Sequence, residues 1–313
     1  MAKLTRYESI QSKTMLNSVK ATSMPFNYSL NPYRGCQHGC SFCYARSTHA
    51  FLGERTDDTF QHHIFLKNNA ADALREQLVK ASRSKQGLDR FGPVAIGTAT
   101  DPYQQIESRA MLTRQCLEVL AEYEVPVSVT TRSPLILRDL ELLKRMKVAS
   151  INLSVHTVNT NVWRRFEPST PSPAKRLDTV KTLVEEGLPA GIFMAPILPL
   201  ITDTDNELDL FVRVAAASKA SFVMPSFLRL NTSEVKYWFF ETLRTHYPEF
   251  VTTYASYYHA SHHLPDGYRL PMKKKVHTLL ARYGLADKEP FIRPPENATP
   301  DLPEGPIQLS FTF

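Results

Sequence analysis

The stretch Asn31-Pro-Tyr-Arg-Gly-Cys-Gln-His-Gly-Cys-Ser-Phe-Cys-Tyr44 holds three of the four cysteines in the chain. Cys36, Cys40 and Cys43 follow the spacing C-x3-C-x2-C. Thiolates are the ligands that iron–sulfur clusters require, and three of them this close can bind three corners of a [4Fe–4S] cubane. The fourth iron then stays open to another molecule. The motif therefore indicates a reactive centre rather than a metal site with a purely structural role.

Two other interpretations of the cysteines stay open at this stage. One is a zinc site with His38 or His49 as the fourth ligand, although structural zinc usually combines two cysteine pairs that are distant in sequence. The chain has no second pair. The other is a set of three unrelated buried thiols. Cys116 is interpreted as a small core residue, so no donor is left for an additional cluster.

Outward from this loop, short β-rich runs alternate with amphipathic helices, which is typical of a parallel sheet with crossover helices. Gly187 follows one helical run and is a usual helix-terminating residue. The expected strands are 27–33, 93–97, 125–130, 150–155, 190–195 and 221–227, and a further apolar run spans 63–67. The expected helices are 70–82, 110–123, 134–146, 173–186, 205–218, 233–246 and a short one from Lys273 to about Tyr283.

About six β/α units predict an α/β fold, a partial (β/α)6 barrel with a C-terminal helical extension and an irregular tail from about Lys288. We expect an N-terminal extension over 1–26, the barrel over 27–230, and an extension over 231–313 that closes the barrel. Chemistry in such barrels takes place at the C-terminal ends of the strands. Candidate site residues follow the expected strands there: the cysteine loop, Thr98 to Asp101, Thr131 and Arg132, Ser154 and His156, and Pro196.

The composition is that of a folded protein, and its formal net charge of +6 is compatible with a polyanionic partner such as nucleic acid. Many enzymes of this size are mildly basic, so the charge alone does not decide this point. The N-terminus has no apolar signal region, and no stretch is long and apolar enough to cross a bilayer. Few, clustered cysteines indicate a reducing compartment. We therefore expect a cytoplasmic protein without membrane association.

The motif Cys36-x3-Cys40-x-Phe42-Cys43 resembles that of the radical S-adenosylmethionine superfamily. Flanking motifs resemble its spore photoproduct lyase-like branch, and more closely the bacterial and archaeal relatives called DNA repair photolyase-like. These motifs are Ser29–Cys36 (SLNPYRGC), Gly97–Gln104 (GTATDPYQ), Phe166–Pro168 (FEP) followed by Pro173–Arg176 (PAKR), and Met194–Pro196 (MAP). The similarity extends from about residue 13 to residue 227.

The resemblance implies that the open iron binds S-adenosylmethionine, and that an electron from a flavodoxin- or ferredoxin-type donor releases a 5′-deoxyadenosyl radical. Phe42 would then pack beside the adenine. Arg132 and Ser154 would contact the carboxylate of the cofactor, because a cation and a hydroxyl suit that group. Arg132 could instead form a surface ion pair.

Other matched positions carry two interpretations each. Thr100 and Asp101 lie in the segment that meets the amino end of the cofactor, but Asp101 can equally cap the turn before Pro102. Arg176, together with Glu167 and Lys175, contacts the ligand or forms a structural network. The remaining candidate cofactor contacts are Tyr44 and Pro196.

One departure from the branch is informative. Spore photoproduct lyases carry a cysteine in a Ser-Cys-Thr-Ser-Asp run, which donates hydrogen to the product radical, and Thr98 stands at that position. A hydroxyl O–H bond is far stronger than a thiol S–H bond, so Thr98 cannot take over this step. The nearby Tyr103 could, unless it only packs. We therefore do not expect spore photoproduct lyase activity itself.

The sequence thus favours a radical S-adenosylmethionine enzyme that abstracts hydrogen from a nucleobase or nucleic acid. A small metabolite or a peptide is the alternative substrate. A third hypothesis is a metal-containing nucleic-acid binding protein without catalysis. We expect a monomer or a dimer.

Overall fold

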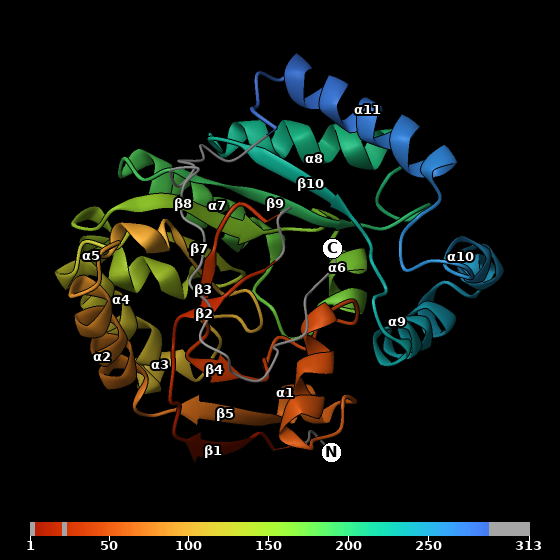
Figure 1. Ribbon diagram of the computed structural model, residues 1–313. Helices are drawn as coiled ribbons and strands as arrows, with labels where there is room; N and C mark the ends of the chain where they lie inside the picture. Colours follow the sequence, from red (N-terminus) through yellow and green to blue (C-terminus); the bar gives the residue numbers. More distant parts are fainter. Residues whose placement is uncertain (1–3, 21–23, 288–313) are drawn as a thin grey trace.

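The computed structural model describes residues 4–20 and 24–287, and its centre is a sheet of seven strands in the order β10-β9-β8-β7-β6-β3-β2 (Figure 1). Six of these strands pair in parallel, and β2 pairs with β3 antiparallel. The predicted α/β class and the six parallel strands of a partial barrel are confirmed. The strands are β2 (Asn17–Ser18), β3 (Tyr28–Leu30), β6 (Val94–Ile96), β7 (Val127–Thr131), β8 (Val148–Ser154), β9 (Ala190–Ile197) and β10 (Val223–Phe227).

The parallel strands are apolar because helices cover them on the outside, as Figure 1 shows. All three residues of β6 are buried, and so are the last six of β8. Two of the helices begin at polar caps, where the Ser172 hydroxyl accepts the Lys175 N–H and the Thr204 hydroxyl accepts the Glu207 N–H. These outer helices are α2 (Ala70–Ser82), α4 (Leu112–Glu122), α7 (Pro173–Glu185) and α8 (Asp205–Ala217).

A second sheet, in the order β1-β5-β4, consists of β1 (Arg6–Ile10), β5 (His63–Lys67) and β4 (Tyr33–Arg34). The predicted single strand over 27–33 is therefore wrong, because β3 and β4 belong to different sheets. The chain leaves the large sheet at Asn31, where the strand pairing ends. The Asn31 side chain forms hydrogen bonds with Ala99 and Thr98. Pro32 follows and has no N–H to donate. The break directs the chain into the cysteine loop.

Three predicted helices differ from the structure by more than one residue at an end. The segment predicted as a helix over 134–146 is a 3-10 helix, η3 (Pro134–Asp139), followed by α5 (Leu140–Lys144). Helix α4 begins at Leu112 because Met111 takes a left-handed φ of 54°. The last helix, α11 (Asp266–Arg282), begins before the predicted Lys273 and includes Pro271.

The C-terminal helices α9 (Ser233–His246) and α10 (Val251–Tyr257) pack with α6 (Thr160–Phe166) around a second apolar cluster that includes Phe166, Phe239 and Tyr254. The predicted irregular tail lies outside the described residues. No helix in the described part of the chain is long and apolar enough to span a membrane. The remaining short elements are η1 (Tyr44–Leu52), α1 (Thr59–His62), η2 (Asp89–Phe91), α3 (Glu107–Ala110) and η4 (Pro248–Phe250).

Gly97 permits the sharp turn after β6. Its φ is +95°, and an added Cβ would lie 2.2 Å from the Thr130 carbonyl oxygen and 2.8 Å from Pro102 Cδ. We predict that Gly97→Ala lowers the free energy of unfolding by about 3 kcal/mol or more. The cost of a left-handed backbone at alanine and the cost of the steric clash at Cβ add to each other. Gly187→Ala is the matched control, because Gly187 has a φ of +81° and nothing within 4 Å of the added Cβ. Urea unfolding should show a loss near 1 kcal/mol for the control; equal losses would contradict the packing argument.

Candidate active site

A cavity of about 390 Å³ lies at the C-terminal ends of β6, β7, β9 and β10, where the cysteine loop crosses the strand ends. All three motif cysteines line it, so the fold brings them to one space. Arg229 and Asn231, which follow β10, also line this cavity. The predicted site residues in the lining are Cys36, Cys40, Phe42, Cys43, Tyr44, Thr98, Thr100, Asp101, Arg132 and Pro196.

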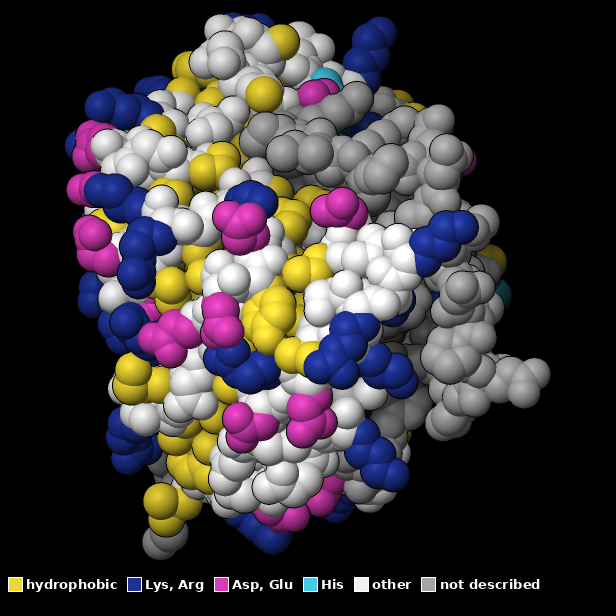
Figure 2. Space-filling model, turned by 60° about the vertical axis from the view of Figure 1, so that its left-hand side comes forward, with side chains coloured by type: hydrophobic (Ala, Val, Ile, Leu, Met, Phe, Trp, Pro, Cys, Tyr) yellow, Lys and Arg dark blue, Asp and Glu magenta, His cyan; other side chains and the backbone are white. Residues whose placement is uncertain are grey.

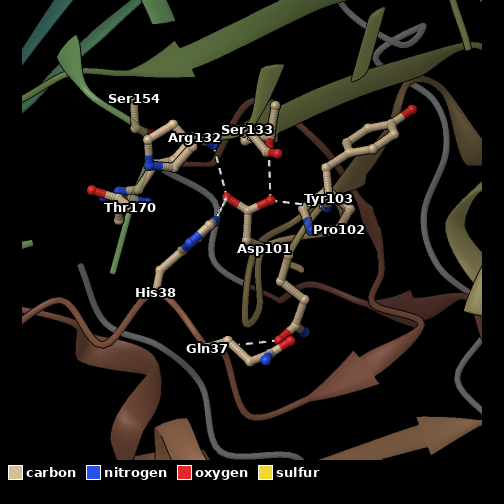
Figure 3. A network of polar contacts seen from close by, with 12 residues as sticks. Gln37, His38, Asp101, Pro102, Tyr103, Arg132, Ser133, Ser154 and Thr170 are labelled. Carbon is tan, nitrogen blue, oxygen red and sulfur yellow. Dashed lines mark hydrogen bonds and ion pairs between the residues drawn. The ribbon is translucent and has the colours of Figure 1, made fainter. Parts of the chain in front are cut away.

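Three predicted site residues lie outside this lining: Tyr103, Ser154 and Arg176. Tyr103 is 1% exposed and packs into the main apolar core, and Figure 3 shows its ring directed away from Asp101. Burial and the Asp139 carboxylate raise the pKa of Tyr103. Tyr103 therefore does not line the cavity with the motif cysteines, and its position fits the packing alternative. Ser154 is buried at the end of β8, and its carbonyl accepts a hydrogen bond from Arg176 Nη1 at 2.7 Å.

The Asp101 carboxylate joins three segments beneath the cavity (Figure 3). One oxygen accepts hydrogen bonds from the Thr131 hydroxyl at 2.6 Å and the Tyr103 N–H at 2.9 Å. The other accepts the Arg132 N–H at 2.7 Å and lies 3.1 Å from His38 Nε2 in the cysteine loop. Burial alone would raise the pKa of Asp101, but His38, the Thr131 hydroxyl and the Arg132 N–H together lower it to about 2. Asp101 is therefore a carboxylate that caps the turn and secures the loop.

Further hydrogen bonds fasten the cysteine loop to the segment after β6. The Thr100 hydroxyl donates to the Gly35 carbonyl at 2.6 Å, and Gln104 Nε2 donates to the same carbonyl at 3.2 Å. The Gln104 side-chain oxygen accepts the Gln37 N–H at 3.0 Å. Gly35 has a φ of +78°, and an added Cβ would lie 2.7 Å from the His63 carbonyl oxygen. The loop therefore approaches the backbone of β5 closely.

Glu167 is a second buried carboxylate that joins several side chains, and it lies beside Cys40. Its two oxygens accept from Arg132 Nε at 2.8 Å and from Arg176 Nη2 at 2.6 Å. His156 Nδ1 lies 3.3 Å from the Glu167 carboxylate, and the Cys40 thiol lies 3.9 Å from it. Burial would raise the pKa of Glu167, but Arg176, His156 and Arg132 hold it well below its usual value. Arg176 therefore belongs to the structural network, whereas Arg132 joins this network to the cavity.

The donor set fits an iron–sulfur cluster better than a zinc ion. Burial, with smaller contributions from Asp101 and Cys43, raises the pKa of Cys36 to about 12, so metal binding must displace a proton from this thiol. Among the described residues, no three His, Cys, Asp or Glu side chains converge to hold one metal ion. His38 is paired with Asp101, and His49 Nε2 lies 3.1 Å from the His63 carbonyl oxygen. In a cubane, each thiolate binds a different iron, so convergence on one point is not needed.

Sequence reasoning missed several residues that shape this site. His38 was weighed only as a zinc ligand, and Asn31, Gln104 and the fully buried Arg46 were not singled out. Asn31 and Gln104 lie within the motifs that flank the cysteines, and this position is the sequence feature that could have indicated a role at the site. Each of them bonds to a partner more than 60 positions away in sequence, and those contacts could not be inferred.

Comparisons with known proteins agree with this geometry. The family model of the radical SAM superfamily matches residues 30–214. Uncharacterized protein Rv2578c of Mycobacterium tuberculosis is 33% identical over 302 residues, which cover 95% of this chain and 86% of the relative. Uncharacterized protein MJ0683 of Methanocaldococcus jannaschii is 28% identical over 241 residues, which cover 77% of this chain and 83% of the relative.

The structure of a spore photoproduct lyase complexed with dinucleoside spore photoproduct superimposes with a TM-score of 0.63 at 16% identity. The match covers 88% of this chain and 79% of that chain, so the fold is shared over nearly the whole molecule. The family and the fold are those of enzymes, which contradicts the hypothesis of a binding protein without catalysis. The chain belongs to the radical S-adenosylmethionine superfamily.

Proposed function

We propose that Cys36, Cys40 and Cys43 bind a [4Fe–4S] cluster and that S-adenosylmethionine binds its open iron. The observation that carries the proposal is that all three thiols face one cavity at the C-terminal edge of the parallel sheet. When bound, the two groups supply a one-electron cleavage that yields a 5′-deoxyadenosyl radical, which takes hydrogen from a substrate. The four cysteines are free thiols, which supports a reducing compartment such as the cytoplasm. The electron would come from an external one-electron donor of the flavodoxin or ferredoxin type.

Arg132 is the residue best placed to bind the carboxylate of S-adenosylmethionine. Its side chain lines the cavity and is 22% exposed, while Glu167 holds its Nε. The remaining guanidinium N–H groups can serve a ligand, and Arg is suited to carboxylates. Phe42 lines the same cavity, which supports a packing role beside the adenine.

Thr98, Thr100 and Asp101 take different parts in this proposal. Thr100 and Asp101 already hold the loop through hydrogen bonds within the protein. The Thr98 hydroxyl oxygen accepts from Asn31 Nδ2 at 3.0 Å, so its own hydrogen can be donated to a ligand in the cavity. Thr98 thereby positions a ligand without donating a hydrogen atom to a radical. The Tyr44 hydroxyl donates to the Thr98 carbonyl and supports this wall.

A nucleobase or a nucleic acid is the substrate class that we propose. The net charge of +6 and the position of Arg229 on the cavity wall support it, as does the dinucleoside bound by the lyase of shared fold. Figure 2 shows a face on which Lys and Arg alternate with Asp and Glu, so that face is no basic footprint. We expect contact with phosphates near Arg229, which lines the cavity. A small metabolite or a peptide is the alternative.

Removing one motif thiol tests the cluster. Cys40→Ala should bind much less iron than the wild-type chain, which should hold about four irons after anaerobic reconstitution. It should also release no 5′-deoxyadenosine when reduced with S-adenosylmethionine. Cys116→Ala is the control, because Cys116 is a fully buried core residue on α4 and should leave both readouts unchanged. Full iron and nucleoside release by Cys40→Ala, or a wild-type chain that binds only zinc, would contradict the proposal.

Removing the Glu167 charge tests the network that holds Arg132. Glu167→Gln should lower the free energy of unfolding of the metal-free protein by about 3–5 kcal/mol, since two guanidinium groups lose their buried partner. Because the pKa of Glu167 is lowered in the folded state, the difference from wild type should be complete at pH 7 and shrink as the pH falls below about 4. Glu186→Gln, which breaks the exposed pair with Lys144, should cost about 0–1 kcal/mol. A pH-independent difference would show that the charge does not matter.

Fluorescence anisotropy with a labelled single-stranded oligonucleotide tests the substrate class. The affinity should fall as salt rises, because bound phosphates release counterions. Arg229→Gln should weaken binding by about tenfold through loss of a charged hydrogen bond. Arg83→Gln, at the exposed residue directly after α2, is the control and should bind normally. Salt-independent binding, or none, would favour the small metabolite or the peptide.

A further inference from the structure

Arg46 is a fully buried cation directly behind the cysteine loop. Its side chain is 0% exposed, and it lies three positions after Cys43 in η1. The Arg46 N–H donates to the Cys43 carbonyl at 3.4 Å, so the backbone ties the two residues together. Burying a guanidinium without an anionic partner is expensive. The surroundings of Arg46 should therefore reveal what balances its charge.

Two aromatic rings hold the guanidinium. The Arg46 Cζ lies 4.2 Å from the centroid of the Trp238 ring, which belongs to α9, and 5.6 Å from that of Phe60. Phe60 lies in the same apolar cluster as Cys36 and lines the cavity. These cation–π contacts hold the guanidinium against the two rings.

The hydrogen bonds of Arg46 are incomplete. Nη1 donates to the Asp57 carbonyl at 2.6 Å, but the buried Nε and Nη2 have no hydrogen-bond partner among the described residues. The Asp57 carboxylate is occupied by Arg55 at 2.8 Å and by Thr59. Burial lowers the pKa of Arg46, and the groups that oppose this effect are, in order, Cys43, Cys40, Cys36 and Asp58. The three motif cysteines are therefore among the groups that would stabilise the charged Arg46 once they are thiolates.

We propose that Arg46 balances the negative charge of the cluster held by Cys36, Cys40 and Cys43 and thereby favours its reduced state. This inference rests on the proposed cluster. A core with two positive charges and three thiolates is a monoanion, and one added electron makes it a dianion. A fixed cation nearby stabilises the dianion more than the monoanion. The electron comes from an external one-electron donor, and no bond or proton changes at Arg46.

The experiment measures the midpoint potential of the reconstituted cluster by anaerobic titration followed by electron paramagnetic resonance. The variants are Arg46→Gln, which removes the charge, and Arg46→Lys, which keeps it. Arg55→Gln is the matched control, because Arg55 lies in the same part of the chain but its side chain is 84% exposed. Iron content is measured in parallel, so that loss of the cluster is distinguished from a change in its potential.

Arg46→Gln should disfavour cluster reduction at least about tenfold, which is a shift of about 59 mV to more negative potential for one electron. In Arg46→Lys the equilibrium constant for cluster reduction should stay within about threefold of wild type. In Arg55→Gln the midpoint potential should equal that of wild type, since solvent screens an exposed charge. An unchanged potential in Arg46→Gln would overturn the inference and leave the cluster proposal intact. A wild-type chain without a cluster would instead refute the proposed function. If Arg46→Gln fails to retain iron, retention by Arg46→Lys supports the charge-balancing role, and loss in both variants overturns it.

Discussion

The buried carboxylate of Asp101 is the interaction on which the site depends. It accepts hydrogen bonds from the turn after β6 and from the end of β7, and it faces His38 in the cysteine loop. A buried carboxylate must find several donors, because its desolvation is otherwise too costly. The donors come from three segments, so satisfying this one group fixes the loop against the strand ends. The cysteine thiols then face a cavity rather than the solvent.

Cations near the cysteine loop complete this arrangement. Arg132 reaches the cavity and is held by Glu167, which also binds Arg176. Arg46 contacts the rings of Phe60 and Trp238. Because helix α9 supplies Trp238, the C-terminal part of the chain contributes to the surroundings of the loop as well as to the apolar cluster. The fold therefore provides both the thiol donors and the positive charge that an anionic group requires.

Much of the fold could be predicted, because long buried strands and amphipathic helices have clear periodic patterns. The bounds of α9 agree with prediction, and the six parallel strands were recognised. The errors have local causes. The break at Asn31 depends on a side-chain bond to residues after β6, and the start of α4 depends on the left-handed Met111. Neither the hydrogen-bond partner nor the left-handed turn has a signature in the hydrophobic pattern.

The sequence by itself determined the donor set, because three cysteines separated by so few residues must lie close together in any fold. It also determined that Asp101 and Arg132 follow strand ends, which meet at one edge of a parallel sheet. Only the tertiary structure decided that Arg132 faces the cavity while Tyr103 turns into the core and Arg176 into a buried network. The physical reason is that spacing along the chain fixes proximity within a loop. The direction of a side chain at a strand end depends on the packing and hydrogen bonds of segments far apart in sequence.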